Sequence, residues 1–175
     1  RDFFMNLYER YGCIQEAVVR MEQLNKTLMN RKKFEIRANV QPLYAGDVIS
    51  GLKVFEVPGH SPDSILLYDE ETEWQFVGDV VLNPGASNAI IDFDDNMELL
   101  LTVAQQENSL RMCQQLQASV VFAGHQWPFS NLSEVVDSKL AGIHKKSERI
   151  IEQIKKGNTQ AMPLAKAIYG NLVEK

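Results

Sequence analysis

The chain has 175 residues, of which 45% are hydrophobic and 23% are charged, as is usual for a globular domain with one core. Its net charge of -5 at pH 7 argues against a general nucleic-acid-binding protein, because such proteins present a basic surface. No apolar run approaches the roughly 20 residues that a membrane span needs.

The first 45 residues are predicted to be mainly helical. Residues 2–11 form a short helix that ends at Gly12, because glycine suits the position after a helix. A second helix is predicted from Ile14 to about Asn30. Its apolar residues step by four and three along one face: Ile14, Val18, Met21, Leu24 and Leu28.

The middle of the chain is predicted to form strands. Residues 52–57 alternate in polarity and form a strand that ends at Pro58-Gly59. Residues 64–68 and 73–77 are two further apolar runs, and the polar turn between them predicts a β-hairpin. Residues 83–95 are rich in Asn, Pro, Gly and Asp, which predicts a loop.

A long helix and one more strand follow this loop. The helix is predicted from Asn96 to Gln117, with an apolar stripe of Leu99, Val103, Leu110, Cys113 and Leu116. Residues 119–123 have no polar side chain after Ser119, which predicts a strand that is buried on both sides.

The rest of the chain is predicted to be helical. The spacing of Asn131 and Glu134 resembles a capping box that opens a helix, and Gly157 ends this helix. Its predicted buried stripe consists of Val136, Leu140, Ile143, Ile150, Ile151 and Ile154. Residues 160–169 form one more short helix. Strands covered by helices indicate an α/β fold.

Two cysteines, Cys13 and Cys113, lie far apart in helical contexts. This favours two buried thiols in a reducing compartment over a disulfide. Together with the absence of a recognisable signal peptide, it predicts a cytoplasmic protein.

Three candidate metal ligands each follow a predicted strand. His60 ends the sequence Val-Pro-Gly-His, Asp79 ends Val-Gly-Asp, and His125 ends Ala-Gly-His. The glycine before each ligand allows the backbone to turn sharply over the sheet edge. Each motif alone is more typical of an ordinary turn, but the three in this order favour a metal site. Imidazole and carboxylate together suit zinc or iron.

These motifs resemble the third, fourth and fifth metal motifs of the metallo-β-lactamase-fold superfamily, and the segment 108–116 is similar to a helix of its glyoxalase II-like branch. The resemblance implies half of a four-layer αββα fold with extra helices at both ends. We expect residues 1–130 to be the C-terminal part of that domain, with 1–45 helical and 46–130 β-rich. Residues 131–175 are expected to be a helical extension.

The resemblance also implies roles for the ligands. His60 would bind a first metal, Asp79 would bridge two metals as the catalytic carboxylate, and His125 would bind the second. Two zinc ions are implied, with iron or manganese as alternatives. A metal-bound hydroxide would then attack a small ester or thioester substrate. The short separation of Asp79 and His125 leaves no room for the inserted domain of nuclease-type members.

The chain departs from the superfamily because the first motif, His-x-His-x-Asp-His, is absent from it. The start at Arg1 within a helical pattern predicts a fragment, and a closed zinc site needs four ligands, so we expect this chain alone to be inactive. The missing layer would expose an apolar sheet face and favour self-association. The alternative function is a non-catalytic, degenerate scaffold or dimerisation module.

Three further residues are candidates near the site. His144, on a predicted helix, either contacts the substrate or is a surface or packing residue. Trp127 follows His125 and could wall a substrate pocket, although aromatic residues at strand ends more often belong to the core. Asp63 either caps the local turn or changes access to the metals.

Overall fold

A computed structural model of the protein describes residues 2–12, 18–19, 22–23, 26, 36 and 38–170. The chain divides into two compact units, one of residues 41–143 and one of residues 1–40 with 144–175. The domain boundary predicted after residue 130 stays a prediction. Among the described residues, no helix is both long enough and apolar enough to cross a membrane.

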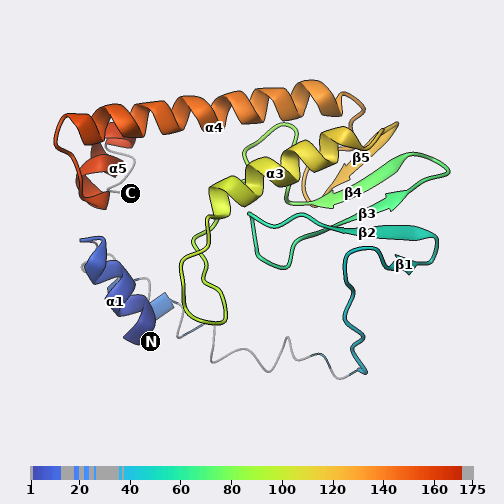
Figure 1. Ribbon diagram of the computed structural model, residues 1–175, viewed down its shortest axis with the longest axis horizontal. Coiled ribbons are helices and arrows are strands. Elements are labelled where there is room, and N and C mark those ends of the chain that lie inside the picture. The colour runs from blue at the N-terminus through green and yellow to red at the C-terminus, as the bar shows by residue number, and fades with distance from the viewer. Residues whose placement is uncertain are drawn as a thin grey trace. The chain divides into compact units, whose positions relative to one another are not determined.

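One five-stranded sheet forms the centre of the unit of residues 41–143, in the order β1-β2-β3-β4-β5 (Figure 1). The strands are β1 (Val48–Ile49), β2 (Leu52–Glu56), β3 (Ile65–Asp69), β4 (Trp74–Gly78) and β5 (Val120–Ala123). Neighbours from β1 to β4 are antiparallel, whereas β5 is parallel to β4. The four predicted strands and the predicted hairpin are therefore confirmed, and β1 is an additional short strand.

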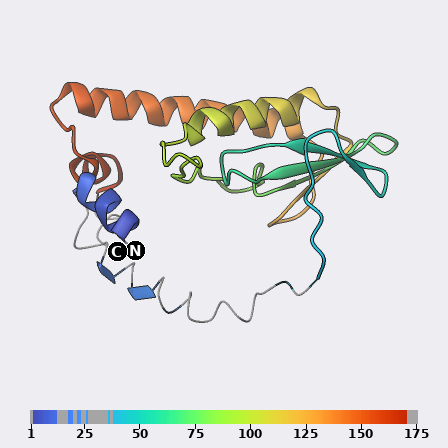
Figure 2. The same cartoon turned by 60° about the horizontal axis from the view of Figure 1, so that its bottom comes forward.

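Helix α3 (Thr102–Gln115) and the first part of α4 (Leu132–Lys155) cover one face of this sheet (Figures 1 and 2). Helix and sheet share one core, which includes Leu66, Val77, Leu110, Cys113, Val121, Leu132, Val136 and Leu140. Burying a Val or Leu side chain contributes about 1.5–3 kcal/mol, so this core fixes α3 against the sheet.

Helix α3 begins at Thr102, so its predicted start at Asn96 was wrong. The preceding residues form a separate turn, in which Asp94 Oδ1 accepts hydrogen bonds from the backbone N–H groups of Asn96 and Glu98 at 2.9 and 2.8 Å. Met97 in this turn has a φ of 64°. Such local bonds to an aspartate compete with helix formation, which explains the later start.

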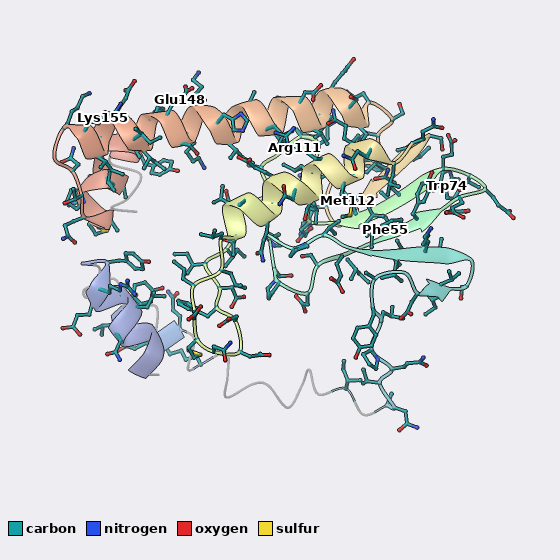
Figure 3. The ribbon with its side chains drawn as sticks, viewed as in Figure 1. Phe55, Trp74, Arg111, Met112, Glu148 and Lys155 are labelled. Carbon is teal, nitrogen blue, oxygen red and sulfur yellow. The ribbon has the colours of Figure 1, made fainter. Side chains whose placement is uncertain are left out.

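The buried face of α3 is more polar than the predicted stripe. Leu110 and Cys113 are buried as predicted, but Leu99 and Val103 are 48% and 50% exposed, so that part of the stripe was wrong. Polar side chains take their place on the buried face: Thr102, Gln106 and Ser109. Arg111 and Met112, labelled in Figure 3, lie on the exposed side of the helix.

The other face of the sheet is apolar and only partly covered. The strand register places Trp74, Phe76, Val120 and Phe122 on this face, which we call the open sheet face. The Phe76 and Phe122 rings stack 4.9 Å apart, and Trp74 (Figure 3) lies edge-on 5.2 Å from Phe122. Val120 and Phe122 are only half-buried. The prediction that residues 119–123 are buried on both sides was therefore wrong.

The start of α4 is confirmed, because Asn131 directly precedes its first residue, Leu132. The Asn131 side chain donates to Glu134 Oε2 at 3.2 Å, so the capping contact runs between the two side chains. The predicted buried stripe does not continue to Ile151 and Ile154, which are 50% and 46% exposed. That part of the prediction was wrong.

The unit of residues 1–40 and 144–175 contains α1 (Asp2–Arg10), the rest of α4, and α5 (Ala161–Tyr169). Helix α1 ends at Arg10, and Gly12 follows in the turn after it with a φ of 70°, as the predicted glycine stop requires. The predicted short helix at 160–169 is confirmed as α5. Most of the predicted helix 14–30 lies outside the described residues, as does Cys13.

Candidate metal centre

The three predicted ligands follow strands that end at the same edge of the sheet. Strands β2 and β4 are both antiparallel to β3 and so point the same way, and β5 is parallel to β4. The carboxyl ends of these three strands therefore meet at one edge. His60, Asp79 and His125 follow these ends, which brings together residues that are far apart in the sequence.

Asp79 lies within reach of both histidines. Its Oδ2 atom is 3.8 Å from Nε2 of His60 and 3.6 Å from Nε2 of His125. Both distances exceed those of hydrogen bonds. Two ligands bound at about 2.1 Å to one tetrahedral zinc ion lie about 3.4 Å apart. Each imidazole–carboxylate pair is therefore close to the spacing of two ligands on one ion.

The two pairs share one carboxylate oxygen but do not form a complete ligand set. In the part of the chain that the structure describes, no group of three or more His, Cys, Asp or Glu side chains is arranged to hold an ion. Zinc sites use three or four protein ligands, so neither pair by itself would complete such a site. Nitrogen and oxygen donors of this kind fit zinc or iron.

The His60 ring is oriented by the loop after β4. Its Nδ1 atom lies 2.9 Å from the backbone carbonyl oxygen of Asn88. Because a carbonyl oxygen only accepts hydrogen bonds, Nδ1 carries the proton in this contact. In the neutral ring, Nε2 then keeps its lone pair and is the atom nearest Asp79. Metal-binding histidines are commonly held by such a bond to the second nitrogen.

Gly59 allows α3 to pack directly on the turn that carries His60. Its φ is 135°, and a Cβ at this position would lie 2.6 Å from the backbone N and Cα atoms of Gln106. Only glycine fits such a close approach and such a backbone angle. The expectation of a sharp glycine turn before His60 is therefore confirmed.

Gly124 is needed for a different reason than the predicted sharp turn. Its φ lies outside the left-handed region, but a Cβ there would lie 2.5 Å from Oδ1 of Asp79. Its backbone N–H also donates to the carbonyl oxygen of Gly78 at 2.8 Å. The glycine before His125 thus makes room for the carboxylate of Asp79.

Two polar residues of α3 that the sequence analysis missed hold the ligand turns. Ser109 Oγ donates to the carbonyl oxygen of Pro58 at 2.7 Å, next to the His60 turn. Gln106 Nε2 donates to the carbonyl oxygen of Val80 at 3.1 Å, next to Asp79. Thr102, Gln106, Ser109 and Cys113 are spaced by four, three and four positions, so they lie on one face of α3. This spacing could have predicted that the buried face of the helix is partly polar.

The other candidates lie in different surroundings. Ser61 Oγ donates to Asp63 Oδ1 at 2.7 Å, so Asp63 stabilises the turn after His60. Trp127 is 84% exposed shortly after His125, so it is not part of the core of the described unit. His144 belongs to the unit of residues 1–40 and 144–175, and its contact with a substrate stays a prediction.

The chain is similar to known proteins in both sequence and fold. No family model matches the chain. The Bacillus subtilis protein named "Probable metallo-hydrolase YqjP" is 23% identical over 130 residues, which cover 74% of this chain and 41% of that protein. The atrochrysone carboxyl ACP thioesterase of Aspergillus fumigatus is 29% identical over 109 residues, which cover 62% of this chain and 23% of that protein. The chain thus spans less than half of either curated relative.

A solved structure shares the fold over nearly the whole chain. The crystal structure of a metallo-beta-lactamase family protein from Thermus thermophilus matches with a TM-score of 0.74 and 20% identity, over 96% of this chain and 53% of that one. This match confirms the predicted half of the four-layer fold. By its fold, the chain is similar over nearly its whole length to a protein of the metallo-β-lactamase family.

Proposed function

We propose that this chain supplies His60, Asp79 and His125 to the two-metal site of a hydrolase of the metallo-β-lactamase superfamily. The observation that carries the proposal is the position of Asp79 Oδ2, which lies 3.8 Å and 3.6 Å from the two histidine Nε2 atoms. In this proposal, Asp79 would bind both ions and would act as the catalytic carboxylate of this half of the site. A His-x-His-x-Asp-His segment outside this chain supplies the remaining ligands.

The chain's own residues prepare the ligands. The contact with Asn88 keeps the neutral His60 ring turned so that Nε2 is free to bind. Gly124 leaves space for the Asp79 carboxylate. Bound metal ions would acidify water and polarise the bond under attack. Zinc suits this donor set, with iron or manganese as the alternatives that metal analysis would identify.

The proposed substrate is a small ester or thioester, in the manner of a glyoxalase II-like enzyme. Support comes from the two curated relatives, one named a metallo-hydrolase and the other a thioesterase. Trp127 offers an exposed aromatic surface directly beyond His125 for the apolar part of the substrate. His144 stays a candidate substrate contact, which its substitution tests. A reducing, cytoplasmic location agrees with the buried free thiol of Cys113.

The first experiment is to read the coding sequence upstream of Arg1. A His-x-His-x-Asp-His motif there supports the hydrolase. A start codon directly before Arg1 instead favours the second candidate function, a non-catalytic scaffold or dimerisation module. The partly uncovered open sheet face favours this second function, because exposed apolar surface is typical of protein–protein interfaces.

The decisive experiment measures metal content and thioester hydrolysis in the protein that contains both parts. We expect His60→Ala and His125→Ala each to lose about one ion, and Asp79→Ala to lose both and all activity. His144→Ala is the control, because we expect it to retain both ions while turnover falls. Full metal content in Asp79→Ala, or hydrolysis by the 175-residue chain alone, would contradict the proposal.

A further inference from the structure

Gln106 contacts both of the turns that carry ligands. Its side chain is 2% exposed, and its Nε2 donates to the carbonyl oxygen of Val80 at 3.1 Å, directly after Asp79. Its backbone lies so close to the other turn that a Cβ on Gly59 would come within 2.6 Å of its N and Cα atoms. One residue of a rigid helix therefore meets the residues that flank two ligands.

The amide of Gln106 is only partly satisfied. Its Oε1 atom is buried and accepts no hydrogen bond from the described residues. A buried acceptor without a partner is energetically unfavourable, so this end of the amide does not stabilise the fold. What the amide adds is the hydrogen bond to Val80, which fixes the turn of Asp79.

We propose that Gln106 is a positioning residue that sets the separation of His60 and Asp79; the inference rests on the proposed function. Its backbone limits how far the His60 turn can approach α3, and its side chain holds the Asp79 turn to the same helix. Metal ions tolerate deviations of only about 0.2 Å in ligand distances, so loss of this connection weakens metal binding.

The test compares Gln106→Met with Gln75→Met. Methionine keeps the length of glutamine but cannot donate a hydrogen bond. Gln75 is a matched control because it is 0% exposed and also has a buried Oε1 without a partner among the described residues. Its Nε2 donates to the carbonyl oxygens of Cys113 and Leu116, at the other end of α3, away from the ligand turns.

Two measurements separate positioning from general stability. In the metal-free protein, we expect Gln106→Met to shift the NMR resonances of the backbone amides of Gly59, His60, Asp79 and Val80 and to speed their hydrogen exchange. Zinc affinity, measured against a chromophoric chelator, should fall about 10- to 100-fold, as for other residues that support ligands. Gln75→Met should lower the melting temperature but leave these amides and the zinc affinity unchanged.

The inference is overturned if the two variants change zinc affinity equally, or if Gln106→Met leaves the four amides unchanged. Zinc affinity is measured in the protein that contains both parts of the site. If that protein binds no zinc, the proposed function fails, and the amide measurements alone decide whether Gln106 positions the turns. Should Gln106→Met not fold, Gln106→Asn serves instead, because its shorter amide no longer reaches Val80 and the same shifts are expected.

Discussion

The carboxylate of Asp79 packs against Gly124, so that a Cβ at position 124 would lie 2.5 Å from Asp79 Oδ1. The two residues follow neighbouring parallel strands, β4 and β5, and the N–H group of Gly124 donates to the carbonyl oxygen of Gly78 at 2.8 Å. The glycine before one candidate ligand therefore determines where another candidate ligand can lie.

Gly124→Ala should displace the Asp79 carboxylate with little loss of stability. The closest atom is the end of a movable side chain, whereas the nearest backbone atom, the carbonyl carbon of Gly78, is 3.3 Å away. We expect the free energy of unfolding to change by less than about 1 kcal/mol. Zinc affinity should fall at least about 10-fold. Urea unfolding and zinc titration measure the two effects, and unchanged zinc affinity would contradict the prediction.

Gly59→Ala should instead destabilise the fold. The new Cβ would meet the backbone of Gln106 at 2.6 Å, and the φ of 135° is unfavourable for alanine. We expect a loss of about 3 kcal/mol or more in the free energy of unfolding, from strain and displacement of α3.

Gly142→Ala in α4 is the control for both glycine substitutions, because a Cβ there meets nothing within 4 Å. It should stabilise the protein by about 0.5–1 kcal/mol, since alanine favours the helix. Equal effects of Gly59→Ala and Gly142→Ala in urea unfolding would refute the packing argument.

The buried thiol of Cys113 should make stability fall at alkaline pH. Burial raises the pKa of Cys113 from 9.0 to about 12. The folded state thus favours the neutral thiol. This contribution is complete below pH 9 and is lost as the pH rises toward 12. Urea unfolding at pH 7 and pH 10 should show a smaller alkaline decline for Cys113→Val than for the parent. If the free energy of unfolding falls equally in both proteins between pH 7 and pH 10, the prediction for Cys113 is wrong.

The open sheet face should cause this chain to self-associate. Phe76 and Phe122 stack there, and Trp74 is 39% exposed. Phe122→Lys places a charge in the centre of this face, so we expect the associated form to dissociate to monomers in sedimentation velocity. Trp127→Lys is the control, because this exposed tryptophan lies beyond the end of β5. If the parent chain stays monomeric at high concentration, the prediction that the open sheet face causes self-association is wrong.

Much of the fold could be predicted from local sequence patterns. Two apolar runs and the polar turn at 69–72 indicated the hairpin of β3 and β4, and Gly12 marked the end of α1. The three candidate ligands were identified because each follows a strand and a glycine. The strand directions then bring His60, Asp79 and His125 to one edge of the sheet.

The residues that support the ligands depended on tertiary structure. Gln106 and Val80 are 26 positions apart, and Ser109 and Pro58 are 51 apart, so no local pattern predicts these bonds. The sequence alone determined which residue types follow the strand ends, because strand and turn preferences are local. Only the packing of α3 on the sheet decided which polar side chains are buried, since burial depends on contacts between distant parts of the chain.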